Sequence, residues 1–101
     1  MTNTTDQLRE TCRAFVHDLE APSKTSQRDM IDNALDLEFT INSRGDFLGA
    51  RILVAFGGPN IWIDTRFDRV EGFWGDDRVD QSYHDENNVH EYCEDLLNCV
   101  R

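Results

Sequence analysis

The apolar residues of this chain change their spacing at Leu37, and this change limits the folds that the chain can adopt. Over residues 4 to 20, apolar side chains recur every three or four positions, which is the period of an amphipathic helix. From Leu37 to Asn42, apolar and polar residues alternate, which is the period of a strand with one buried face. A chain that carries both periods in separate segments belongs to the α+β class.

The remaining segments extend this pattern into a meander. Two helices are expected before the strands and one after them, with turn residues such as Gly45 and Gly57-Gly58 between the strands. The expected helices cover residues 4–20, a short segment capped by Ser26, and residues 85–100; the expected strands cover 37–41, 47–56, 61–66 and 69–74. We therefore predict an α+β fold, an antiparallel four-stranded meander with two N-terminal helices and one C-terminal helix, in a single domain over residues 1–101.

The apolar positions of these segments predict the core. The residues expected to be mainly buried are Leu8, Phe15, Leu19, Leu37, Phe39, Ile52, Val54, Phe56, Ile61, Ile63, Val89, Cys93 and Leu96. The run Ile52 to Phe56 is apolar on both faces, which predicts a central strand that is covered on both sides, at least near its end. The cysteines are odd in number and widely spaced, so we expect reduced thiols and no disulfide framework.

Charge is the most informative bulk property of the sequence. Twenty acidic residues against ten basic ones give a formal net charge of −10. Residues 76 to 95 hold eight carboxylates against the single base Arg78, so this segment alone contributes 8 − 1, a net of −7. Such a surface repels nucleic acid and attracts basic proteins. No apolar run is long enough to cross a bilayer and no signal peptide is recognisable, so we expect a cytoplasmic protein.

Catalytic and metal-binding patterns are weak in this sequence. His84, His90, Cys93 and Cys99 lie close together, but their spacing matches no zinc knuckle. Asp64, Asp68 and Glu71 could bind Mg²⁺, but exposed cross-strand pairing with the interleaved Arg66 and Arg69 is the stronger interpretation. We therefore expect a protein that is not an enzyme and that uses no cofactor or metal, with a small metal-dependent enzyme as the alternative of another class.

Two motifs carry a resemblance to a known family. The run GGPNIWIDT at residues 57–65 is followed by VEGFWGD at residues 70–76. Together they resemble a motif of small acidic proteins encoded by bacteriophages and mobile elements. The resemblance implies a phage-related protein, and small acidic phage proteins include anti-CRISPR inhibitors of host defence. It carries over no catalytic residues.

These observations favour a phage-encoded, anti-CRISPR-like inhibitor that acts by protein binding through an acidic surface that mimics nucleic acid. Its expected partner is a basic nucleic-acid-binding protein or complex of the host, such as a CRISPR effector, bound by a monomer or small homo-oligomer without membrane or direct nucleic-acid contact. The expected partner-binding residues are Asp76, Asp77, Asp80, Glu91, Glu94, Asp95, Trp74 and Tyr83, the last two as exposed aromatic anchors. An immunity protein or antitoxin that neutralises a basic nuclease is an alternative, and so is a virion-associated role.

Overall fold

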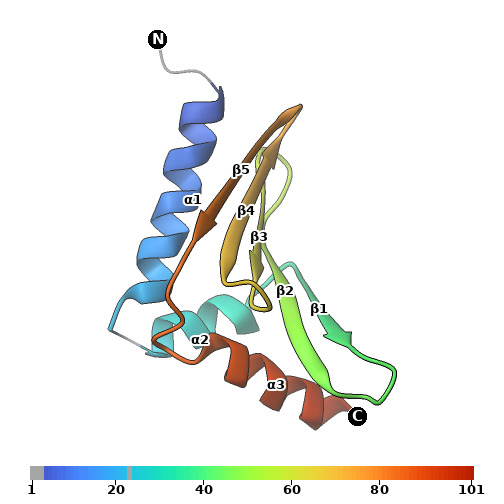
Figure 1. Ribbon diagram of the computed structural model, residues 1–101. Helices are drawn as coiled ribbons and strands as arrows, with labels where there is room; N and C mark the ends of the chain where they lie inside the picture. Colours follow the sequence, from blue (N-terminus) through green and yellow to red (C-terminus); the bar gives the residue numbers. More distant parts are fainter. Residues whose placement is uncertain (1–3, 23) are drawn as a thin grey trace.

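The protein folds into three helices and a five-stranded antiparallel sheet (Figure 1). The computed structural model describes residues 4–22 and 24–101, so predictions that fall on the first three residues and on Ser23 lie outside it. Along the chain, the elements are α1 (Thr4–Glu20), α2 (Lys24–Asp32), β1 (Asp36–Ile41), β2 (Phe47–Ala55), β3 (Asn60–Asp64), β4 (Arg69–Trp74), β5 (Asp77–Ser82) and α3 (Val89–Val100). The predicted α+β class is confirmed.

The sheet is a meander in which neighbours in sequence are neighbours in space, from β1 at one edge to β5 at the other. Four of the strands were predicted, and β5 was missed. Val79 is the only buried residue of β5, and it lies opposite Gly72 of β4. An edge strand with one apolar side chain shows no alternation that a sequence reading can detect. The segment after Gly75, for which no helix or strand was predicted, therefore contains a strand.

The starts of α2 and α3 also differ from prediction. The second helix begins at Lys24, two residues before its expected cap at Ser26. The last helix begins at Val89 and not at Asp85. The Asp85 carboxylate instead accepts the backbone N–H groups of Val89 and His90, at 2.7 and 3.1 Å. Asp85 thus satisfies free donors at the start of α3 from outside the helix.

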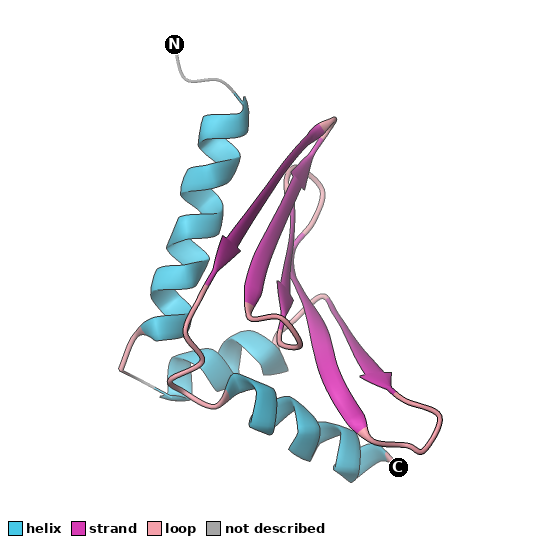
Figure 2. Cartoon of the chain, in the orientation of Figure 1, coloured by secondary structure: helices cyan, strands magenta, loops and turns pink. Residues whose placement is uncertain are grey.

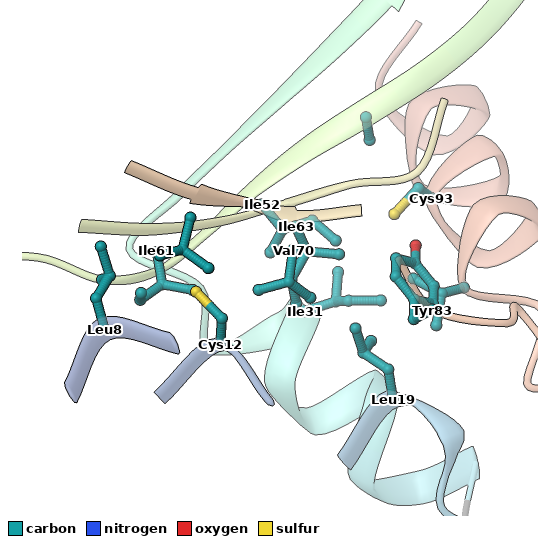
Figure 3. Packing of buried hydrophobic residues seen from close by; sticks show 13 residues of the cluster. Leu8, Cys12, Leu19, Ile31, Ile52, Ile61, Ile63, Val70, Tyr83 and Cys93 are labelled. Atoms are coloured by element: carbon teal, nitrogen blue, oxygen red, sulfur yellow. The ribbon is translucent and has the colours of Figure 1, made fainter. Parts of the chain in front are cut away.

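All three helices lie on one side of the sheet (Figure 2). α1 crosses β4 and β5, and α3 packs beneath β2. The core between these layers is drawn in Figure 3 and includes Leu8, Cys12, Leu19, Ile31, Ala50, Ile52, Ile61, Ile63, Val70, Val79, Tyr83, Val89 and Cys93. α1 approaches the sheet closely at Gly72, where an added Cβ would lie 2.5 Å from Cys12 Sγ. Glycine at this position therefore allows the helix and the sheet to meet.

The predicted core is confirmed except at one position. Seven of the residues predicted to be buried are fully buried and five more are half-buried against them. The prediction that Phe56 is buried is wrong, because its side chain is 72% exposed. β2 ends at Ala55 after an irregularity between Leu53 and Ala55, so Phe56 lies beyond the last paired residue. The prediction of a central strand covered on both sides holds only in part. β2 is an internal strand and Leu53 is buried on its helix-free face, but β3 is the central strand and all three helices cover the other face.

Candidate protein-binding site

The acidic segment does not form one continuous surface. The expected binding residues Asp76 and Asp77 lie at the tip of the β4–β5 hairpin, whereas Glu91, Glu94 and Asp95 lie on α3. The hairpin tip and α3 are at opposite ends of the molecule (Figure 1). The carboxylates that are dense in the sequence are therefore divided into two groups, which need to be considered separately.

The hairpin group is partly neutralised and partly covered. Asp80 lies 3.4 Å from the guanidinium of Arg78, which reduces its field. Asp77 is half-buried and shares the helix-covered face with Val79. Asp76 is exposed in the turn before β5. Of this group, one carboxylate is both exposed and outside the sheet.

The α3 group lies beside a pocket. Glu91 and Asp95 are one helical turn apart, and both line a hollow of about 240 Å³ between α2 and α3. The other lining residues are Arg28, Asn87, Asn88 and Tyr92. Glu94 falls on the flank of α3 next to His90 when 100° per residue is counted. The structure therefore brings together two of the predicted binding residues and leaves Glu94 beside them.

The walls of this pocket are fixed by contacts to distant parts of the chain. The Asn87 side-chain amide donates to the carbonyls of Leu19 and Ala21, at 2.8 and 2.7 Å. The Tyr92 hydroxyl donates to the Asp32 carboxylate of α2 at 2.8 Å, and this hydrogen bond raises the pKa of Tyr92. These bonds attach the start of α3 to the end of α1 and hold α2 against α3. The pocket is thus formed before a ligand arrives.

The chemistry of the pocket suits a cation. The side-chain carboxylates of Glu91 and Asp95 make no ion pair or hydrogen bond with any residue in the described part of the chain. The one basic lining residue, Arg28, stacks over the Tyr92 ring at 5.2 Å from its centroid. Two unpaired carboxylates one turn apart can accept the donors of a guanidinium or ammonium group. The lining residues Arg28, Asn87, Asn88 and Tyr92 were missed, and Arg28 lies too far away in sequence to give a signal.

Of the two aromatic residues expected as exposed anchors, Tyr83 is buried and Trp74 is half-buried. Tyr83 is 4% exposed and belongs to the core, where its hydroxyl is directed toward Cys93 (Figure 3). Burial raises the pKa of Tyr83, so the phenol is neutral. Trp74 is half-buried and packs against the same core. The prediction of exposure is wrong for Tyr83 and holds only in part for Trp74, because β5, which was not predicted, carries the chain back beneath α1 between these residues.

The carboxylates around the β3–β4 hairpin have structural partners. Glu71 is 8% exposed, 3.9 Å from Arg51 and 3.5 Å from Arg78. The expected pairing with Arg66 and Arg69 is wrong, because neither makes an ion pair within residues 4–22 and 24–101. Instead, arginines of β2 and β5, on the strands either side of the β3–β4 hairpin, reach Glu71 across the helix-free face. Among the described residues, no three His, Cys, Asp or Glu side chains are placed to hold a metal ion.

The cysteines and histidines of the weak zinc pattern are dispersed. Cys93 is buried and its pKa is raised to about 12, chiefly by burial. His90 lies 3.1 Å from the carbonyl oxygen of Thr65 through Nδ1, whereas His84 and Cys99 are exposed. Cys12 is also buried, and burial raises its pKa to about 11. All three thiols are free, and the two buried ones are protonated and unreactive at neutral pH.

We expect Asp68→Asn to stabilise the protein by a few tenths of a kcal/mol at pH 7. Burial, and then the Asp85 carboxylate, raise the pKa of Asp68 above 3.8. A raised pKa in the folded state means that the charged form is destabilising at neutral pH, and that this cost disappears as the pH falls through the raised value. Asparagine tolerates the left-handed backbone at this position, where φ is 53°. Urea unfolding of both proteins at pH 7 and at about pH 3 tests this, because the difference between them should vanish at the acidic pH.

Comparison with known proteins leaves the site to be interpreted from its own geometry. Searches against protein-family models, curated proteins and solved structures find no match to this chain. No helix within the described residues is long and apolar enough to cross a membrane.

Proposed function

We propose that this protein binds a basic protein partner through the pocket between α2 and α3, and that Glu91 and Asp95 accept a lysine or arginine side chain of that partner. The observation that supports the proposal is the pair of unpartnered carboxylates lining one preformed hollow. Charge-assisted hydrogen bonds to two carboxylates give both orientation and energy. The net charge of −10 adds long-range attraction for a basic surface and increases the rate of association.

The α2–α3 end supports this role better than the β4–β5 hairpin does. The hairpin carboxylate Asp80 already has an arginine neighbour, and Asp77 is half-buried. A partner would therefore have to displace Arg78 to reach Asp80, whereas Glu91 and Asp95 can be reached without breaking an ion pair. The hairpin remains a second, weaker point of electrostatic attraction in this proposal.

The partner class follows from the same charges. A surface that binds phosphates carries lysine and arginine side chains that can also accept rigid carboxylates. The proposed partner is therefore a nucleic-acid-binding protein, and the protein would inhibit it by occupying that surface. Inhibition of a host defence complex, including a CRISPR effector, stays a prediction within this class.

Competition for one surface provides the test. The protein would be used to capture partners from host lysate, and a captured protein would be purified and titrated against a labelled nucleic acid that it binds. We expect the added protein to displace the labelled nucleic acid from the partner, and a single inhibition constant for simple competition should describe the titration. Simultaneous binding of both ligands to the partner, with no loss of nucleic-acid affinity, would contradict the mimicry.

A further inference from the structure

β1 forms one edge of the sheet, and its helix-covered face bears apolar side chains that the helices leave partly uncovered. Leu37 and Phe39 are half-buried, and Ile41 is 50% exposed. All three point to the helix-covered side, because each alternates with the polar Glu38 and Thr40 along the strand. The main sheet contact of α3 is with β2, so the apolar layer of the sheet continues at β1 past most of its helical cover.

Hydrogen bonds of the adjoining strands fix which backbone groups of β1 face outward. The N–H of Ala50 donates to Thr65 Oγ1 at 2.8 Å, and its carbonyl accepts the Thr65 N–H at 2.9 Å. Ala50 therefore faces β3, and Phe39, its partner in register, faces away from β2. The Asn42 N–H, three residues on, points back into the hairpin and donates to the Asp46 carbonyl at 3.0 Å, as the alternation requires.

Leu37, Phe39 and Ile41 consequently present their N–H and C=O groups to the outer edge. The Leu37 N–H has a local acceptor, the carboxylate of Asp36 at 2.9 Å. At this edge, the N–H groups of Phe39 and Ile41 have no backbone partner within residues 4–22 and 24–101. An edge of this kind is a template for another strand.

The sequence of β1 is self-complementary in one antiparallel register. A two-fold axis through Phe39 pairs Leu37 with Ile41 of a second copy, and Phe39 with its own counterpart, all on the helix side. On the other side, Glu38 meets Thr40 and Asp36 meets Asn42, so no carboxylate faces another across the axis. A register centred on Leu37 would instead place Asp36 opposite Glu38 and bring like charges together.

We propose that this protein forms a two-fold dimer by antiparallel pairing of β1 with β1 of a second copy, in the register centred on Phe39. The two sheets then join into one continuous sheet, with the α3 helices on its same face. Pairing covers Ile41 and completes the burial of Phe39, and the Leu37 N–H exchanges its local carboxylate for a backbone carbonyl. Each copy carries a net charge of −10, so salt should tighten this contact by screening repulsion.

Sedimentation velocity over a concentration series tests the dimer with two matched variants. We expect the wild type to pass from monomer to dimer as its concentration rises. The variant Ile41→Lys should raise the dissociation constant of the dimer at least about tenfold, because it buries a lysine against Leu37 in both halves of the contact. Thr40→Lys makes the same charge change one residue earlier, but its side chain lies opposite Glu38 of the second copy. We expect that variant to dimerise as tightly as the wild type or more tightly.

Amide hydrogen exchange of the wild type gives a measurement that needs no variant. The N–H groups of Phe39 and Ile41 should become protected as the concentration rises, whereas those of Glu38 and Thr40, which face β2, should be protected throughout. A wild type that stays monomeric at all concentrations, with fast exchange at Phe39 and Ile41, would overturn the proposal. Equal dimerisation by Ile41→Lys and the wild type would also overturn it. Neither result bears on the pocket, whose binding should weaken with salt while dimerisation strengthens.

Discussion

Gly49→Ala is expected to destabilise the fold by about 3 kcal/mol or more, because no space exists for a side chain at this position. A Cβ at Gly49 would lie 2.5 Å from Arg66 Cβ and 2.8 Å from both the Cα and the N of the same residue. Backbone cannot rotate aside as a flexible side chain can, so the β3–β4 turn would have to move as a whole. That turn carries Thr65, which bonds both Ala50 and His90 of α3.

Urea unfolding followed by circular dichroism measures this effect, and Gly58→Ala provides the control. An added Cβ at Gly58 meets nothing within 4 Å, and its φ is not in the left-handed range. We expect Gly58→Ala to change the free energy of unfolding by less than about 0.5 kcal/mol, or to stabilise the protein slightly. Similar small effects from both substitutions would show that the turn can shift away from β2 at little cost.

The sequence predicted most of the fold because the apolar period is strong where one face of an element is buried. α1 agrees with its predicted span, since Leu8, Cys12 and Leu19 are buried in the core at helical spacing. β5 could not be predicted by the same reasoning, because it is an edge strand whose only buried residue is Val79. Arg78 of β5 forms ion pairs with Asp80 of the same strand and with Glu71 of β4, and the second of these depends on a neighbouring strand.

The candidate site was predicted only in part, for a related reason. The density of charge along the chain identified Glu91 and Asp95 as candidates. It could not distinguish these two pocket residues from Asp76 in the β4–β5 turn, because charge density in the sequence does not show where residues lie in space. The distinction depends on α2, which supplies Arg28 to one side of the pocket and Asp32 to hold Tyr92. Contacts between elements so far apart in sequence leave no local pattern.

The double substitution Glu91→Lys with Asp95→Lys is expected to weaken partner binding at least about a hundredfold. Each reversal removes an acceptor for the partner's cation and leaves a buried charge on the partner unpaired, which costs a few kcal/mol per contact. Both side chains are exposed, and neither contributes an ion pair within the described residues, so the fold should be little affected. Isothermal titration against the captured partner, with thermal melts alongside, measures both effects.

The matched control is Asp76→Lys with Asp80→Lys in the β4–β5 hairpin, which changes the net charge by the same amount at the other end of the molecule. If the pocket binds the partner, this variant should lose affinity only severalfold, and the loss should shrink as salt screens long-range attraction. An equal loss in both double variants would mean that net charge alone drives association. Full affinity in the pocket variant, with an unchanged melt, would exclude Glu91 and Asp95 from the binding site. The pocket mechanism therefore requires that the position of the carboxylates, and not their number, determines the affinity.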